Sequence, residues 1–132
     1  MITISKDKSK LQLDVIYQFL TNSYWAKGRT KEQVKTTINS CLCFGLYKDD
    51  VQIGFGRVAT DYAVFAYLMD LFVLPEYRGI GYSKQLMNEI INAKELKDCR
   101  SWMLKTFDAQ GLYKQFGFTE LKNPDIVMER LL

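Results

Sequence analysis

The sequence predicts a single α/β domain, residues 1–132, built on a mixed sheet with helices on both faces. Three observations support this class. Segments with strand-like apolar patterns alternate with segments of helical periodicity. The length of 132 residues suits one domain with one sizeable core. The hydrophobic fraction of 48% and the charged fraction of 25% are typical of a folded globular chain.

A strand and two helices are expected at the start of the chain. Residues 2–5 alternate apolar and polar side chains, which indicates a short strand. Apolar residues then recur at helical spacing from Leu11 to Leu20, which predicts the first helix. Thr30 and Gln33 fit a capping box, in which each side chain bonds the other residue's backbone N–H. A second, short helix should therefore start there.

Three strands are expected next. Residues 41–48 and 51–60 form a predicted hairpin, because Asp49-Asp50 between them is a turn signal. Residues 63–74 are a mostly apolar run that predicts a buried central strand. Pro75 ends this strand, because proline cannot donate to a sheet ladder.

The remaining third of the chain should alternate helices and strands. A helix is predicted from Lys84 to about Ala93, with Leu86, Met87, Ile90 and Ile91 on one side. A strand over 101–106, a helix over 109–115, and strands over 118–121 and 126–131 follow.

Composition excludes several kinds of chemistry. The chain has no histidine, which removes Ser-His-Asp and Cys-His catalysis, histidine-ligated zinc and a histidine general base. Cys41, Cys43 and Cys99 are an odd set for a disulfide framework, and they lack further ligands at metal-site spacing. No metal is expected. Cys41 and Cys43 should share one strand face as small buried groups.

Charge and hydropathy limit the partners. The net charge of +3 is too mild to indicate nucleic acid. No segment approaches eighteen consecutive apolar residues, so no membrane span is expected. Residues 1–6 lack the apolar core of a signal peptide, which makes the cytoplasm the expected compartment.

The most informative stretch runs from Asp70 to Ser83 and joins the central strand to the next helix. The first turn of a helix has unpaired backbone N–H groups and positive partial charge. Gly79 and Gly81 let the backbone approach a bulky anion such as a pyrophosphate, and Arg78 adds charge. The glycine spacing is neither that of a P-loop nor that of a dinucleotide fingerprint.

Within this stretch, Val73-Leu-Pro-Glu-Tyr-Arg-Gly-Ile-Gly-Tyr-Ser83 resembles the acetyl-CoA signature of the GNAT superfamily of N-acetyltransferases. That signature is Arg/Gln-x-x-Gly-x-Gly/Ala after a Val-x-Pro strand end. Arg78 and Gly81 match it, whereas Ser83 stands where Gly or Ala is usual. An ordinary strand-to-helix turn is the alternative; a glycine pair alone would favour it, but the whole run favours the signature.

The resemblance implies a mostly antiparallel sheet with a splayed strand pair that receives acetyl-CoA as cosubstrate. A backbone N–H near Phe72 or Val73 would then stabilise the oxyanion. The residues that match the family's cofactor site are Phe72, Val73, Arg78, Gly79, Ile80, Gly81, Tyr82, Ser83 and Lys84.

A second segment, residues 109–118, resembles the other recognisable GNAT motif. There a tyrosine protonates the departing CoA thiolate, and Tyr113 is the matching position. Thiols and phenols have ordinary pKa values of about 8.5 and about 10, close enough for proton transfer. Core packing is the alternative role for Tyr113, and the two motifs in the right order favour catalysis.

Two groups are expected on the acceptor side. Asp70 is the preferred general base or amine anchor, although it could equally cap a loop or pair with an arginine. The resemblance also places Tyr24, Trp25 and Arg29 beside the acceptor site. For Trp25 alone, packing at the edge of the core is the favoured interpretation.

The predicted function is acetyl transfer from acetyl-CoA to a primary amine by direct attack, because no cysteine lies in either motif. The acceptor could be a small molecule or a protein amine. One alternative is a non-catalytic acyl-CoA-binding or regulatory module on the same fold. A nucleic-acid binder is the other, which no arginine–lysine stripe supports. Homodimers are common in this family.

Overall fold

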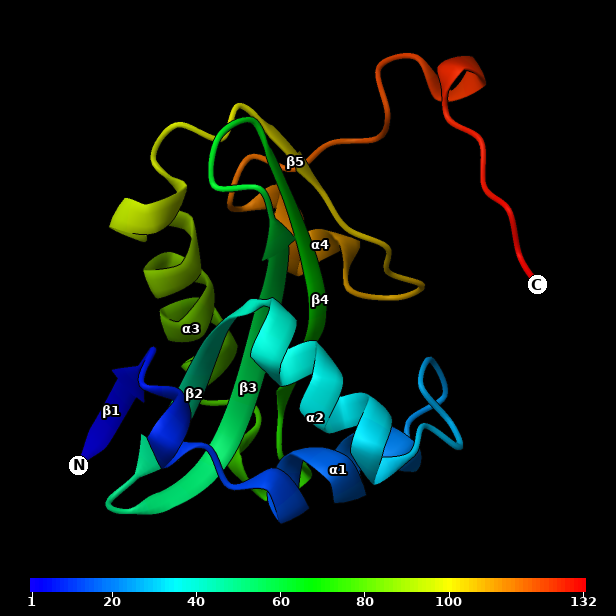
Figure 1. Ribbon diagram of the computed structural model, residues 1–132. Helices are drawn as coiled ribbons and strands as arrows, with labels where there is room; N and C mark the ends of the chain where they lie inside the picture. Colours follow the sequence, from blue (N-terminus) through cyan, green and yellow to red (C-terminus); the bar gives the residue numbers. More distant parts are fainter.

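The computed structural model describes all 132 residues, and a five-stranded sheet forms its centre (Figure 1). The strands lie in chain order: β1 (Ile2–Ser5), β2 (Leu42–Lys48), β3 (Val51–Thr60), β4 (Phe65–Val73) and β5 (Ser101–Met103). Neighbours from β1 to β4 are antiparallel, and β4 and β5 are parallel. The predicted mixed, mostly antiparallel sheet is confirmed.

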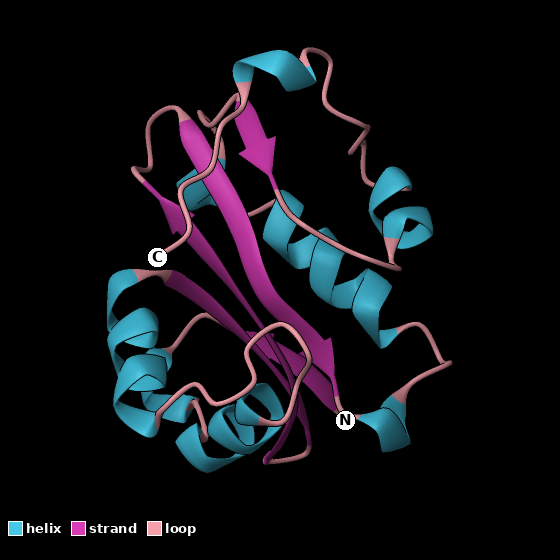
Figure 2. Ribbon diagram, turned by 90° about the vertical axis from the view of Figure 1, so that its right-hand side faces the viewer, coloured by secondary structure: helices cyan, strands magenta, loops and turns pink.

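Helices cover both faces of this sheet, as predicted (Figures 1 and 2). Helices α1 (Leu13–Thr21) and α2 (Lys31–Ser40) cover one face, and α3 (Tyr82–Ile91) and α4 (Gln110–Lys114) lie on the other. Strand β2 contributes side chains to the hydrophobic core on each face of the sheet, because successive side chains of a strand point to opposite faces. Cys43 packs with the α1–α2 core, and Phe44 with the α3 core. None of the helices combines the length and the apolar character that a membrane span requires.

Polar contacts fix where α1 and α2 begin. The predicted capping box is present: Gln33 N–H donates to Thr30 Oγ1 over 3.1 Å, and Thr30 N–H donates to Gln33 Oε1 over 2.9 Å. At α1, Gln12 N–H donates to Gln52 Oε1 over 2.7 Å, and Gln52 N–H returns a bond to Gln12 Oε1 over 3.1 Å. Gln52 is fully buried, so this exchange pins α1 to β3.

A β-bulge lies in the second half of β4. Arg57 of β3 pairs with Met69, but Gly56 then faces the two residues Asp70 and Leu71. Asp70 has φ 55°, a left-handed conformation that is uncommon for a residue with a side chain. Bulges re-aim side chains and bend the strand that carries them. This bulge turns the Asp70 carboxylate toward the α1–α2 side, where its partners lie.

The pairing of β4 with β5 is short. It covers only residues 65–67 of β4 and residues 101–103 of β5. The two chains then diverge, and the rest of β4 has no strand on that side. The splayed pair implied by the family resemblance is present, and β5 ends three residues earlier than predicted, at Met103 instead of Thr106.

The predicted strands over 118–121 and 126–131 are wrong. Residues 119–132 are all exposed and hold only a short 3₁₀ turn, Pro124–Ile126. Figure 1 shows this segment, in orange to red, reaching away from the body. Its strand-like sequence finds no partner strand within the chain, and an isolated strand has no ladder to join.

The Tyr47 hydroxyl is the one buried side-chain nitrogen or oxygen atom without a hydrogen-bond partner, and burial raises its pKa to about 12. Tyr47→Phe removes this unsatisfied group and keeps the ring. We expect the free energy of unfolding to rise by about 1 kcal/mol, measured by urea denaturation. Tyr62→Phe, at a half-exposed ring, is the control and should change nothing. A loss of stability in Tyr47→Phe would mean that the hydroxyl has a partner.

Candidate active site

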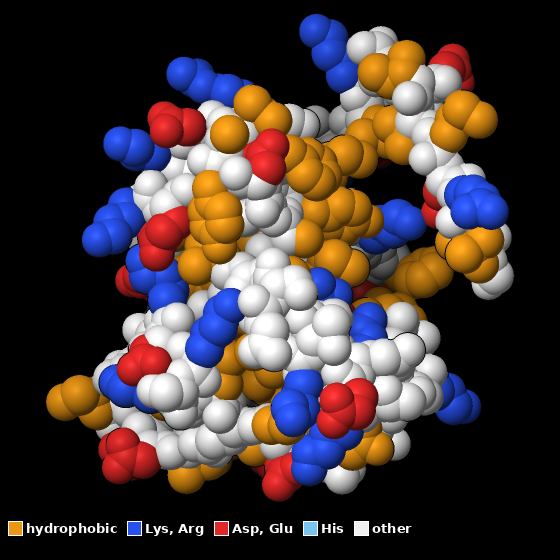
Figure 3. Space-filling view, in the orientation of Figure 1, with side chains coloured by type: hydrophobic (Ala, Val, Ile, Leu, Met, Phe, Trp, Pro, Cys, Tyr) orange, Lys and Arg blue, Asp and Glu red, His pale blue; other side chains and the backbone are white.

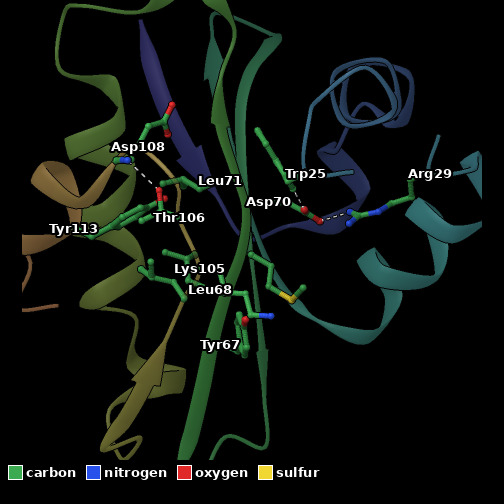
Figure 4. A pocket seen from close by; sticks show the side chains of 13 residues that line it. Trp25, Arg29, Tyr67, Leu68, Asp70, Leu71, Lys105, Thr106, Asp108 and Tyr113 are labelled. Carbon is green, nitrogen blue, oxygen red and sulfur yellow. Dashed lines mark hydrogen bonds and ion pairs between the residues drawn. The ribbon is translucent and has the colours of Figure 1, made fainter. Parts of the chain in front are cut away.

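The splay between β4 and the chain after β5 opens into a cavity of about 280 Å³. Its walls come from residues 67–71 of β4, residues 104–106, 108 and 109 beyond β5, Tyr113 of α4, and Trp25 and Arg29. Figure 4 shows Tyr113 and Thr106 on one side of β4, and Trp25, Asp70 and Arg29 on the other. The cavity therefore reaches both faces of the sheet, so two molecules could approach from opposite sides.

Tyr113 presents a free hydroxyl to this cavity. Tyr113 is half-buried, its ring packs edge-on against Phe118 with centroids 6.0 Å apart, and its hydroxyl bonds no other protein group. Helix α4 is held in place because Ala109 N–H donates to Thr106 Oγ1 over 3.0 Å. Phe118 N–H also donates to the Tyr113 carbonyl, which turns the chain after the helix. The hydroxyl is thus available to a ligand.

Burial raises the pKa of Tyr113 to about 12. The phenol therefore stays protonated at neutral pH, as a proton donor must. It is a weaker acid than a free phenol, which opposes transfer to a thiolate. A thiolate in the same cavity loses hydration too, and its own pKa rises for the same reason. The two shifts partly cancel, so proton transfer from Tyr113 stays chemically reasonable.

Asp70 lies at the other end of the cavity and is held by three donors. Its Oδ2 accepts from Arg29 Nη1 over 2.6 Å and from Arg57 Nε over 2.7 Å, and its Oδ1 accepts from Trp25 Nε1 over 3.0 Å. Burial raises the pKa of Asp70, but the Arg57 hydrogen bond and charge, with Arg29 and Trp25, outweigh it and hold the pKa below 3.8. The carboxylate is ionised at neutral pH and is a weak base.

This geometry favours one of the predicted roles of Asp70 over the others. The expectation that it could pair with an arginine is confirmed twice over. A general base works best with a pKa near the operating pH, so the lowered pKa argues against that role. The carboxylate instead fixes Trp25 and Arg29 at the cavity, which also accounts for the predicted position of these two side chains.

Sequence reasoning missed Arg57. Its side chain is 7% exposed, and its Nη1 lies 3.3 Å from Cys41 Sγ in addition to its Asp70 contact. The available signal was an arginine within the predicted 51–60 strand, next to a strand that carries an aspartate. The register that pairs them depends on the bulge, which the sequence pattern does not reveal.

The glycine loop after β4 forms an open helix start. Gly79 and Gly81 have φ values of 85° and 92°, and a Cβ added at either would meet no atom within 4 Å. Gly81 is the N-cap of α3, and no side chain caps that helix. The first backbone N–H groups of α3 therefore face open space, and the helix start carries positive partial charge. These residues fit a large anion such as a pyrophosphate.

Arg78 is turned back from this loop toward the end of β4. Its Nε donates to the Val73 carbonyl over 2.8 Å, and its guanidinium lies 5.9 Å from the Phe19 ring centroid. The Phe19 ring in turn stacks on Phe72, with centroids 4.1 Å apart. Arg78 thus fixes the loop to the strand end, besides adding positive charge there.

Backbone geometry distinguishes Phe72 from Val73 as the candidate for the predicted oxyanion donor. Leu74 N–H donates to the Ile53 carbonyl of β3 over 2.8 Å. Backbone groups of successive residues point to opposite sides of a strand, so Val73 N–H points away from β3. The Val73 carbonyl also points away from β3, because it accepts a hydrogen bond from Arg78 and none from β3. Of the two residues named from the sequence, Val73 is the one whose N–H is directed toward the splay.

A family model described as an acetyltransferase (GNAT) domain matches residues 39–120, which is more than half of the chain. The protein belongs to the GNAT family. The match includes the bulged strand, the glycine loop and Tyr113.

Relatives agree with this membership. The crystal structure of a Xanthomonas campestris protein, described as belonging to the GNAT family, is 43% identical and has a TM-score of 0.97. That match covers 100% of this chain and 94% of the other. A GNAT-family acetyltransferase from Streptococcus pneumoniae is 26% identical, with a TM-score of 0.75, over 100% of this chain and 98% of its own. A candidate acetyltransferase from Gibberella zeae is 28% identical, over 92% of this chain and 81% of its own.

Viewed as a GNAT site, the predicted residues fall into two groups. Residues 72–73 and 78–84 are continuous in space, from the end of β4 to the first turn of α3. Tyr113 and Asp70 line the cavity instead, one on each side of β4. Among these residues, only Ile80 exposes a large apolar side chain, at 62%. Lys105, Thr106 and Asp108 also line the cavity and were missed, because the segment after β5 carries no motif.

Proposed function

We propose that this GNAT protein transfers the acetyl group of acetyl-CoA to a primary amine by direct attack. The observation that carries the proposal is the through-sheet cavity, where the unpartnered Tyr113 hydroxyl lies beside the splayed β4. A cavity lined by side chains from both sides of β4 suits a reaction of two substrates that meet at one strand. The open glycine loop at the end of the same strand supports an anionic cosubstrate.

Each proposed step uses a named group. The neutral amine attacks the acetyl carbonyl carbon, a C–N bond forms, and Val73 N–H stabilises the oxyanion. The C–S bond then breaks, and Tyr113 donates its proton to the departing thiolate. The amine also has to lose a proton. Asp70 is a weak base because its pKa is lowered, and its oxygens already accept from three donors, so it orients the acceptor side. The amine nitrogen becomes acidic once the C–N bond has formed. Its proton then passes through water to solvent, and the Tyr113 phenolate regains a proton from solvent.

A turnover screen tests the proposal directly. Purified protein is incubated with acetyl-CoA and a panel of small amines, amino acids, polyamines and peptides, and thiol release is followed with mass analysis of the product. We expect acetylated amine and free CoA in equal amounts for at least one class. CoA binding without turnover over the whole panel would favour the non-catalytic acyl-CoA module instead.

Gly81→Val tests the cosubstrate site. The new side chain would project into the open space at the start of α3, where the pyrophosphate should lie. We expect CoA to bind at least about tenfold more weakly, since losing about 1.4 kcal/mol of phosphate contacts already gives that factor. Isothermal titration calorimetry with CoA measures it.

Gly28→Val is the matched control for backbone strain. Gly28 also has a positive φ, 81°, and its Cβ would also meet nothing, but it lies in the loop between α1 and α2. It should lose stability as Gly81→Val does and keep CoA affinity. Unchanged CoA affinity in a folded Gly81→Val protein would refute the site.

A further inference from the structure

An open groove of about 630 Å³ lies between the loop after α1, helix α2 and strand β3. Its walls are residues 25–29 of the loop, one face of α2, and Arg57 of β3. Trp25 and Arg29 line both this groove and the through-sheet cavity, so the two spaces are adjacent. A molecule that enters the cavity on the Asp70 side could therefore extend into the groove.

The groove has an excess of positive charge. Three cations line it, Lys27, Arg29 and Arg57, with one carboxylate, Glu32, that is 86% exposed and screened by water. Figure 3 shows Lys and Arg side chains, in blue, over and beside α2. Asp70 binds both arginines, but one carboxylate neutralises only one of them. Holding Asp70 would need a single arginine, so the second leaves a net positive charge at the groove.

This charge is sheltered from water. The Arg29 side chain is 19% exposed and that of Arg57 is 7% exposed. Removing a charge from water is costly unless another group compensates it, and ionic interactions are stronger where water is excluded. An anion in the groove would compensate the charge that Asp70 leaves over.

Both guanidinium groups keep free N–H donors at the groove. An arginine has five N–H donors. Arg29 uses Nη1 toward Asp70, and its other nitrogens bond no protein group. Arg57 uses Nε toward Asp70 and Nη1 toward a cysteine sulfur, which leaves Nη2 free. The Tyr47 hydroxyl is the one buried side-chain nitrogen or oxygen atom without a partner, so these free nitrogens are not sealed in the interior.

The chemistry of these donors selects the ligand. A guanidinium group binds compact anions such as carboxylates and phosphates through paired N–H donors. The phosphates of the cosubstrate are expected at the glycine loop and the start of α3, and no residue of 78–84 lines the groove. An anion in the groove would therefore belong to the other substrate.

We propose that the acceptor carries a compact anionic group, a carboxylate or a phosphate, besides its primary amine, and that Arg29 binds this group from the groove. The inference rests on the proposed acetyl transfer and names the class of acceptor. Arg29 lines both spaces, so the anion can stay with it while the amine reaches into the through-sheet cavity. Arg57 holds Asp70 from below and keeps that carboxylate ionised.

A panel of matched acceptors tests the need for a negative charge. Aminoalkyl carboxylates are compared with their carboxamides, and aminoalkyl phosphates with the corresponding alcohols, each corrected for its fraction of neutral amine. We expect kcat/KM to be at least about tenfold higher for the anionic member of one pair, as one charge-assisted hydrogen bond would give. That pair identifies the anion. Transfer to neutral members that is equal or faster in every pair would overturn the inference and leave acetyl transfer standing.

Arg29→Gln should remove this preference. We expect the KM of the anionic acceptor to rise about tenfold, with little change in kcat or in the KM of its neutral match. The remaining Asp70–Arg57 pair is neutral, so the fold should persist. Arg29→Lys keeps the charge without the paired donors and should keep part of the preference. Lys35→Gln, at an exposed α2 cation outside both spaces, is the matched control and should keep all of it. A preference that survives Arg29→Gln would refute the role of Arg29.

Binding of the anion can also be measured without turnover. The Trp25 indole N–H donates to Asp70 beside Arg29, and its resonance is followed by heteronuclear NMR, with Trp25→Phe to distinguish it from Trp102. N-acetylated aminoalkyl carboxylates and phosphates, the expected products, should shift this resonance in the unmodified protein and not in Arg29→Gln. No shift with any of them would overturn the anion site even if amines are acetylated. A shift without turnover of any amine would refute the proposed function and retain the anion site.

Discussion

Tyr113→Phe is expected to lower the rate of acetyl transfer by about 10²–10⁴-fold, the usual contribution of one positioned acid. The variant keeps the ring that packs on Phe118 and removes only the hydroxyl. Since that hydroxyl bonds no other protein group, its loss leaves no partner unsatisfied. Stability and CoA affinity should therefore stay close to those of the unmodified protein.

Single-turnover kinetics is the proper measurement, because steady-state turnover hides the effect if product release is slow. Tyr67→Phe is the matched control, since its ring lines the same cavity from β4. The dependence of the transfer rate on pH gives a second check of the role of Tyr113.

With a pKa of about 12, Tyr113 loses its proton only as pH rises toward that value. Its donor role should thus persist from about pH 6 to about pH 10. Undiminished transfer in Tyr113→Phe would return this residue to a packing role.

Asp70→Asn is expected to destabilise the fold by about 3 kcal/mol or more, because it breaks a buried ion pair. The Asp70 carboxylate is 1% exposed and the Arg57 side chain 7%, so the arginine charge would be left with Cys41 Sγ as its main partner. Thermal and urea denaturation measure the change. Asp108→Asn, at an exposed carboxylate that lines the same cavity, should be nearly neutral.

The dependence of the free energy of unfolding on acidic pH should also change in Asp70→Asn. The pKa of Asp70 lies below its ordinary value of 3.8 in the folded protein. Its contribution is therefore fully present above pH 3.8, and it is lost as pH falls through the lower folded value. Asp70→Asn should lose this part of the acid dependence. A variant as stable as the unmodified protein would refute the ion-pair account.

Activity of Asp70→Asn should be compared only under conditions where the protein is folded. Arg29→Gln removes the more exposed of the two arginine partners and leaves the buried Asp70–Arg57 pair in place. This variant therefore tests the orientation of the acceptor side without a large loss of fold stability. Equal turnover of Asp70→Asn and the unmodified protein from about pH 6 to about pH 9 would remove Asp70 from the mechanism.

Local signals in the sequence predicted local structure well. The Thr30–Gln33 capping box and the turn at Asp49-Asp50 depend only on residues close together in the chain, and both are confirmed. The bulge at Asp70 escaped prediction because it depends on the register between β3 and β4. The predicted strand over residues 126–131 is wrong for a related reason, because periodicity indicates a strand but does not show whether a partner strand exists.

The candidate site also has one part that the sequence predicted and one part that it did not. The glycine loop was readable because a helix start with Gly79 and Gly81 is one continuous segment. The cavity was not, because its walls come from segments far apart in the sequence. Arg57 became visible as a partner of Asp70 only once the strands were aligned.

The three-residue pairing between β4 and β5 divides the domain into parts of unequal local stability. Residues 101–118 are joined to the sheet by few backbone bonds, so amide hydrogens there should exchange through openings much smaller than global unfolding. Tyr113 lies in this weakly held part, whereas Asp70 lies in β4, which is paired with β3 along most of its length. A ligand bridging the splay would link the two parts, and it would contribute stability that the apo chain lacks.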